Sequence, residues 1–374
     1  MKKNLFILGI AALAFAACSN DEVVEVNQGE AISFRPLVNN VTRAVAKTAF
    51  ATSDVIDVYA DYNGSKSFQD NFTKLADGNF TSTTKHYWPS DIGTGAPAKA
   101  MTFTAFYGAE QSSTTAGSLA ATYTPDAAAS DQTDLLFAKH STTEKEVPVV
   151  LNFRHMLSQI NVLVKNTNNG ISAEITGVRI GYVKTSGTFA YSGDATDTKN
   201  SGKLNQNTWT PTDFTAPGSG ETYANNYKYD QTVSKTINGT ADAGTLTSYV
   251  PWMLIPQNMA GSSTQYQNTK ADGDADDIPD LGGAYIALKM TIYNWNGSAR
   301  GAVIAGEQWC YWPITTAWNP GYNYIYTINI AGGGYMPTDT NGDKNLDPVL
   351  NDPIEFSVSC TIDDWTDSAI DIAN

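Results

Sequence analysis

The feature that most limits the fold of this chain is an alternation of apolar and polar side chains, repeated in many short segments. It is clearest near the C-terminus, where one face of the segment collects Ile354, Phe356, Val358, Cys360 and Ile362. The same alternation occurs over 55–62, 101–107 and 286–292. A period of two is that of a strand with one buried face, and no long segment shows the period of an amphipathic helix. The sequence therefore predicts an all-β protein.

Chain length and turn residues predict how the strands are divided. A chain of 374 residues is long enough for about two domains. The turn-forming run NTNNG at 166–170 follows a strongly apolar segment, so we place the boundary there. We expect two antiparallel β-sandwich domains, at 44–168 and 169–374, and the second of them carries long polar loops.

The N-terminus has the layout of a secretory signal peptide. Two lysines precede an apolar run over 5–17, which is too short to span a bilayer, and small residues stand directly before Cys18. A cysteine at this place is typical of a lipoprotein, in which acyl chains on Cys18 hold the protein to a membrane. The alternative is an ordinary signal peptide at 1–17 followed by an incidental cysteine.

A short strand is expected in the leader, residues 18–43. Ile32 and Phe34 alternate with polar residues, and Val38 continues the strand beyond a proline. Because proline donates no ladder hydrogen bond, it suits an edge strand. The leader ends at Arg43 in a loop of Asn and Thr residues. An arginine in such a loop is either a protease site or simply a solvated side chain.

Charge and motifs exclude several functions. The formal net charge is −15 at pH 7, so nucleic acids and anionic membrane surfaces are poor partners. The sequence contains no HExxH, CxxC, GxSxG or phosphate-binding glycine motif. We therefore expect neither an enzyme nor a bound cofactor.

One acidic run resembles the start of a calcium loop. Oxygen-bearing side chains alternate at Asp339, Asn341 and Asp343. The positions that need Gly and Glu in an EF-hand hold Lys344 and Leu350 instead. We interpret the run as a solvated acidic loop and expect no metal.

Two cysteines remain beyond the leader, Cys310 and Cys360, and both lie in strand-like segments. In an exported protein they can form a disulfide. Two buried thiols also serve as small apolar side chains without a partner. The sequence leaves both alternatives open.

Several segments, in a fixed order, resemble the fimbrillin family, the lipoprotein pilins of type V pili. They are ISFRP with VTRA, YWP before MTFTAFYG, LNFRHMLSQINVLVKN, WNPGYNYIYTINI and SVSCTIDDW. The resemblance implies two transthyretin-like β-sandwich domains and transport as an outer-membrane lipoprotein to the cell surface. It also implies cleavage between Arg43 and Ala44 by an arginine-specific protease. The product would polymerise with other pilin subunits into a fimbrium that contributes to adhesion.

The residues suggest how a strand could link such subunits. An incoming strand adds main-chain hydrogen bonds to a sheet edge, and its alternate side chains fill pockets. Ile354 and Phe356 repeat the spacing of Ile32 and Phe34, so the strand at 354–365 is a candidate donor for a neighbour whose leader has been removed. The alternative is an ordinary last strand, which favours a tip or anchor position.

A rival function comes from a different class. A surface glycan-binding lipoprotein of a polysaccharide-uptake system would use exposed Trp and Tyr side chains as stacking platforms. It would need neither cleavage after Arg43 nor a transferable strand.

Overall fold

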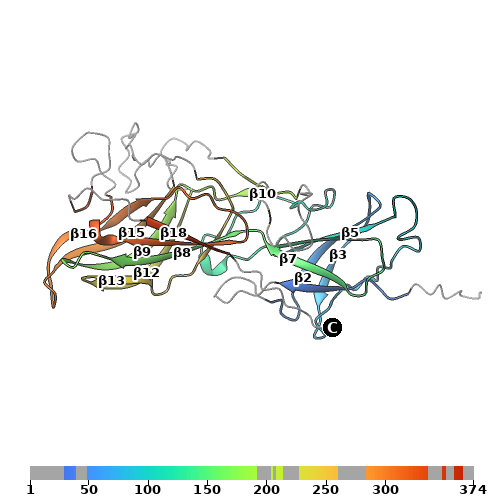
Figure 1. The fold of residues 1–374 in the computed structure, drawn as a ribbon, viewed down its shortest axis with the longest axis horizontal. Helices are drawn as coiled ribbons and strands as arrows, with labels where there is room; N and C mark the ends of the chain where they lie inside the picture. Colours follow the sequence, from blue (N-terminus) through green and yellow to red (C-terminus); the bar gives the residue numbers. More distant parts are fainter. Residues whose placement is uncertain are drawn as a thin grey trace, which may run out of the picture.

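The computed structural model describes residues 29–38, 49–191, 204, 208–213, 227–259, 284–335, 348–350 and 358–364. Almost every element in these residues is a β-strand, which confirms the predicted all-β class. The strands form two units that follow one another along the long axis of the molecule (Figure 1). In the described part of the chain, no helix is long and apolar enough to cross a membrane.

The N-terminal unit is a closed barrel. Around the barrel the strand order is β1-β4-β3-β2-β5-β6-β7, and the sheet closes because β1 pairs with both β4 and β7. The sequence predicted a β-sandwich here, whereas the pairing of β1 on both sides joins the ends of one sheet into a barrel. The strands are β1 Phe34–Val38, β2 Val55–Tyr62, β3 Ser65–Lys74, β4 Phe80–Thr81, β5 Met101–Tyr107, β6 Leu136–Thr142 and β7 Val149–His155.

The barrel core follows the alternation seen in the sequence. In β2, Ile56, Val58 and Ala60 are buried, whereas Asp57 and Asp61 are partly exposed. β2 pairs antiparallel with β5 as well as with β3, so the segments at 55–62 and 101–107 are neighbours in space. The apolar side chains that meet inside include Phe34, Phe72, Phe80, Phe103, Leu151 and Phe153.

The C-terminal unit is a two-sheet sandwich. One sheet has the order β12-β9-β15-β16 and the other β13-β8-β17-β18, with β14 beside β8. Side chains from both sheets form one core, including Val162, Val178, Leu288 and Tyr326. This agrees with the sandwich expected for the second domain, while a transthyretin-like topology stays a prediction. The strands are β8 Ser158–Asn166, β9 Ile171–Gly181, β12 Lys228–Asn238, β13 Ala241–Thr245, β14 Trp252–Leu254, β15 Tyr285–Trp295, β16 Arg300–Pro313, β17 Tyr322–Asn329 and β18 Val358–Asp364.

The boundary between the two units lies earlier than predicted. β7 ends at His155 in the barrel, and β8 begins at Ser158 in the sandwich, where it pairs with β14 and β17. The division predicted after residue 168 is therefore corrected, because the strand over 158–166 belongs to the second unit. The turn at 166–170 instead connects β8 to β9, that is, one sheet of the sandwich to the other.

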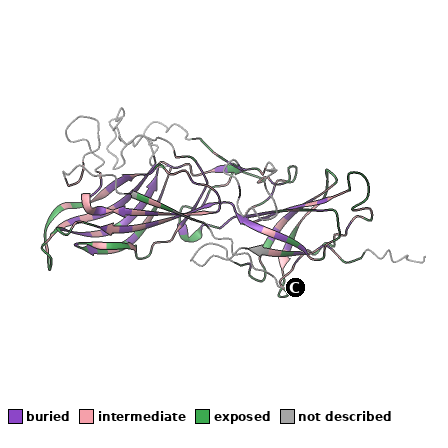
Figure 2. Ribbon diagram, in the orientation of Figure 1, coloured by how far each residue is buried: buried purple, intermediate pink, exposed green. Residues whose placement is uncertain are grey.

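A separate apolar cluster fills the junction. It includes Phe137 and Met156 from the first half of the chain and Trp209 and Met253 from the second. The indole Nε1 of Trp209 donates a hydrogen bond to the Met156 carbonyl oxygen at 2.6 Å. Trp209 lies on a two-stranded ribbon of β10 Gly187–Phe189 and β11 Trp209–Pro211. Buried residues are present in both units and between them in Figure 2.

Candidate functional site

The first strand, β1, is held in the barrel mainly by one neighbour. It runs parallel to β7 along its whole length, from Phe34 opposite Val149 to Val38 opposite Phe153. On its other side it meets β4 at a single register position, Phe34 opposite Phe80. From Arg35 onward, that side of β1 has no strand partner among the described residues. Its removal would therefore break one extended ladder rather than two.

Two apolar side chains fix β1 to the barrel interior. Ile32 is 3% exposed and Phe34 is fully buried. The ring of Phe34 meets the rings of Phe72 and Phe103 edge-on, at centroid distances of 4.8 and 5.1 Å. We call the space between β4, β7 and these two rings the β1 seat. No local pattern marks Phe72 and Phe103 as its lining, because they come from strands that only the folded barrel brings to Phe34.

The backbone explains why a proline is tolerated in β1. The Ser33 carbonyl oxygen accepts a hydrogen bond from the Val149 N–H at 2.8 Å. Alternate residues of a strand direct their backbone groups to opposite edges, so Pro36 faces away from β7. The missing N–H of Pro36 therefore removes no hydrogen bond to β7, as expected for an edge position.

The predicted processing sites lie outside the described residues. This applies to Cys18, to Arg43 and Ala44, and to the side chain of Val38. The described strand ends at Val38, before the expected cleavage position. Lipid attachment and proteolytic maturation stay predictions.

The candidate donor strand lies in a sheet of its own unit. β18 pairs antiparallel with β17 and forms the edge of that sheet. Cys360 is half-buried opposite Tyr326 and packs against the sandwich core. This placement is the ordinary last strand that the sequence left open, so a donor role requires β18 to leave β17. The residues Ile354 and Phe356, and the side chains of Val358 and Ile362, lie outside the described part of the chain.

Both described cysteines, Cys310 and Cys360, are free thiols. Cys310 lies on β16 and Cys360 on β18, in different sheets. The disulfide considered from the sequence is therefore not formed between them. Cys310 is fully buried, which raises the pKa of its thiol to about 12, and it behaves as a small apolar residue.

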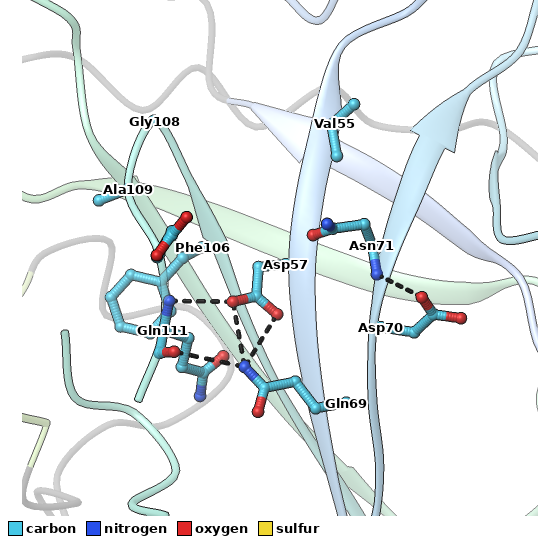
Figure 3. Close-up of a pocket in the computed structure, with 10 residues that line it drawn as sticks. Val55, Asp57, Gln69, Asp70, Asn71, Phe106, Gly108, Ala109 and Gln111 are labelled. Atoms are coloured by element: carbon cyan, nitrogen blue, oxygen red, sulfur yellow. Dashed lines mark hydrogen bonds between the residues drawn. The ribbon is translucent and has the colours of Figure 1, made fainter. Parts of the chain in front are cut away.

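The barrel also carries a pocket of about 560 Å³ between β2, β3 and the loop that follows β5 (Figure 3). The Asp57 carboxylate accepts hydrogen bonds from the Gln69 side chain at 3.1 and 3.2 Å and from the Gln111 backbone N–H at 2.9 Å. Burial raises the pKa of Asp57 above its ordinary value. The central carboxylate is thus bound by groups of the protein itself, and it faces no nucleophile among the residues that line the pocket.

The histidines contact carboxylates. His86 lies 2.9 Å from Asp70, His140 lies 2.9 Å from Glu146, and His155 lies 2.8 Å from Asp134. Within the described residues, no group of three or more His, Cys, Asp or Glu side chains is placed to hold a metal ion. The calcium candidates at 339–343 lie outside those residues.

The fold is that of an all-β protein with a barrel followed by a sandwich, in which the N-terminal segment itself supplies the strand that closes the barrel. The chain belongs to the fimbrillin-like family, whose model matches residues 42–365. This confirms the resemblance found in the sequence. It also confirms that the protein is a structural subunit of a pilin family rather than an enzyme, and that other pilin subunits are its partners.

The chain is similar to several solved structures. A fimbrial protein from Bacteroides vulgatus is 16% identical with a TM-score of 0.50, and the match covers 90% of this chain and 100% of that chain. A fimbrilin from Porphyromonas gingivalis is 11% identical with a TM-score of 0.42, over 90% of this chain and 97% of that chain. At 16% identity the first match shows a common fold only. No curated protein matches the chain.

Proposed function

We propose that this chain is a subunit of a cell-surface fimbrium that polymerises by exchange of its first strand. It is exported as an outer-membrane lipoprotein through Cys18 and loses the leader 18–43 by cleavage after Arg43. A strand of a neighbouring subunit then occupies the β1 seat. The observation that carries the proposal is that β1 completes the barrel and yet pairs along its length with β7 alone.

Removal of β1 leaves a slot that favours a new strand. β7 pairs with β6 only at its last two residues, so most of its ladder is with β1. The pockets of Ile32 and Phe34 open at the same time, and refilling each contributes about 1.5–3 kcal/mol. An unpaired strand beside empty apolar pockets is the type of edge to which an extended segment adds.

The C-terminal strand is the proposed donor. Ile354 and Phe356 have the spacing of Ile32 and Phe34, so both pockets can be filled in the same register. As an edge strand, β18 breaks one ladder when it leaves β17. It is also longer than β1, with seven residues against five. Further apolar side chains in the seat would favour the exchanged state by about 25 cal/mol per Å² buried.

Polymerisation can be tested on the soluble precursor that begins at Ser19. Treatment with an arginine-specific protease should release the leader and give ladders of detergent-resistant oligomers on a gel. An Arg43→Ala variant should keep its leader and remain monomeric. Complete cleavage of the wild-type chain with only monomers remaining would overturn the proposal.

The alternative is a terminal position in the fimbrium. It can be tested by supplying the donor strand as a separate peptide, so that binding to the β1 seat is measured independently of the chain's own C-terminal strand. A synthetic peptide of residues 353–365 should bind the cleaved protein, and a Phe356→Ala peptide should bind at least tenfold more weakly. A cleaved chain that binds the peptide but does not self-polymerise has a working seat and no free donor, as expected for a tip or anchor subunit. Failure to bind the peptide rejects the donor assignment.

A further inference from the structure

The outer face of the sheet β12-β9-β15-β16 carries an aromatic cluster. Tyr285 and Tyr311 are almost fully buried there, and Trp309, Tyr182 and Tyr335 are half-buried beside them. The outer face of an antiparallel sheet is ordinarily polar, because the other face already packs on the core. An aromatic cluster on this face therefore calls for a reason other than the sandwich core.

Two glycines let the rings lie against the sheet. Trp309, Lys289 and Gly177 form one row across β16, β15 and β9. A Cβ on Gly177 would stand 3.1 Å from the Trp309 ring. In the neighbouring part of β9, a Cβ on Gly181 would stand 2.3 Å from the Tyr285 ring. The absence of a side chain at Gly177 and Gly181 thus leaves room for the aromatic rings to pack directly against the sheet.

The side chain of Arg179 stacks on the indole of Trp309. Its guanidinium lies over the Trp309 ring, 4.2 Å from the ring centroid. The Asp230 carboxylate fixes the guanidinium through two hydrogen bonds, of 2.6 Å to Nε and 2.9 Å to Nη2. Arg179 is 5% exposed, whereas Trp309 is half-buried, so the ring covers the arginine and keeps part of its surface in solvent. Such a cation–π contact holds the indole in one orientation.

Polar groups lie beside Trp309 on this face of the sheet, where Lys289 is its register partner on β15. Glu307 contacts the Lys289 ammonium at 3.0 Å and accepts a hydrogen bond from the Thr176 hydroxyl at 2.8 Å. These two contacts, Thr176 first, lower the pKa of Glu307, so it stays a carboxylate at neutral pH. Glu307, Lys289 and Thr176 thus offer a carboxylate, an ammonium and a hydroxyl that are held in place by contacts with one another. The negative charge of Glu307 is largely compensated by the positive charge of Lys289.

The backbone next to the cluster is strained. Tyr182, which directly follows the end of β9, has φ = 55°, in the left-handed region that bulky side chains rarely adopt. This conformation places its ring in the aromatic cluster. Strained residues of this kind concentrate at binding sites, where the surrounding structure maintains them.

We propose that this face binds a carbohydrate, with one pyranose ring stacked on Trp309 and its hydroxyls hydrogen-bonded to Glu307, Lys289 and Thr176. A sugar ring has an apolar C–H face and a polar rim, which matches a flat indole with hydrogen-bonding groups on the adjacent residues of the sheet. A protein partner fits less well, because a stable protein interface needs about 800 Å² from each side, far more than one half-buried indole offers. Arg179 acts as a positioning residue that holds the ring.

The site is tested on the uncleaved monomer from Ser19, so the result does not depend on strand exchange. The protein is applied to an array of hexose, N-acetylhexosamine and uronic-acid oligosaccharides, and binders are measured by calorimetry. Trp309→Ala should lower the affinity at least tenfold, and Trp309→Phe should retain part of it.

Trp295→Ala is the matched control. Trp295 is also half-buried, lies at the end of β15 in the same sheet, and contacts a glycine, Gly239, in the turn between β12 and β13, so its loss should leave the affinity unchanged. The proposal is overturned if no oligosaccharide binds the wild type, if Trp309→Ala binds as tightly, or if both tryptophan variants lose binding equally. Unchanged circular dichroism and melting temperature of each variant exclude misfolding as the cause.

Discussion

The ring of Phe34 stands edge-on to the ring of Phe72, with centroids 4.8 Å apart and planes at 82°. Phe34 belongs to the predicted leader, whereas Phe72 belongs to β3 and would remain in the barrel after the proposed cleavage at Arg43. The contact therefore joins the segment proposed to leave with the body proposed to stay. The contribution of this contact to the stability of the precursor therefore measures how strongly β1 is bound in the β1 seat.

Phe34→Ala should destabilise the precursor by about 3–5 kcal/mol, because it empties a fully buried ring site that the barrel cannot easily close. The free energy of unfolding from urea titrations measures the effect. The neighbouring Arg35 is exposed, so Arg35→Ala should change stability by no more than about 0.5 kcal/mol. Similar losses in both variants would mean that β1 does not depend on the seat.

The pKa of Asp91 should depend on Lys99. The Lys99 ammonium and then the Tyr62 hydroxyl, at 2.6 Å, donate to this carboxylate and lower its pKa from 3.8 to about 2. Because the folded pKa is depressed, the stabilisation is present above the unfolded pKa and is lost as the pH falls through about 2. Carboxyl carbon NMR titration should show the Asp91 pKa rising toward 3.8 in Lys99→Ala. Lys66→Ala, which removes a lysine bonded to Gln69 instead, should leave it unchanged.

The two free cysteines should differ in reactivity. Burial raises the pKa of both thiols, to about 12 for Cys310, so little thiolate forms at pH 8. In the precursor from Ser19, which lacks Cys18, Cys310 should be alkylated only after unfolding. Cys360 should react sooner, because β18 is an edge strand, and its rate should change when β18 leaves β17 for the seat of a neighbouring subunit.

Mass spectrometry of the alkylated peptides measures both rates. If Cys310 in the folded chain reacts as fast as Cys360, the sandwich core is not closed around β16. If the Cys360 rate is the same before and after exchange, β18 has not left β17.

Gly181→Ala should lower the free energy of unfolding by about 1–3 kcal/mol, because the new methyl group would overlap the Tyr285 ring. Gly306 on β16 is the matched control, since nothing lies within 4 Å of its would-be Cβ. Gly306→Ala should leave stability unchanged or raise it by about 0.4–1 kcal/mol. Thermal unfolding of the two variants compares them directly, and equal melting temperatures would contradict the packing of Tyr285 on the sheet.

Much of the local structure followed from the sequence. The alternation at 55–62 and 101–107 became β2 and β5, and Pro36 has the edge position that its missing N–H requires. The apolar positions of the sequence change parity between Phe153 and Ile160, but a bulge within one strand and a crossing between two units produce the same pattern. Only the pairing of β8 with β17 distinguishes them.

The candidate sites were less accessible to sequence reasoning. The spacing of Ile32 and Phe34 indicated the strand. Nothing in the sequence around Phe72 and Phe103, however, indicates that their rings contact Phe34. Trp309 likewise lies in a strand with no distinctive sequence pattern. Its ring packs against Gly177, which is brought close only by the pairing of β16 with β15 and of β15 with β9. Cross-strand neighbours are set by register, which no local segment encodes.

By itself, the sequence determined the all-β class, the strand-forming segments and the family resemblance, because period-two patterning and turn residues act over a few neighbouring positions. The tertiary structure alone decided that β1 closes a barrel, that β18 rests on β17, and that an indole lies over a buried arginine. Those outcomes depend on hydrogen bonds and ring contacts between residues far apart in the chain, whose geometry exists only once the sheets have formed.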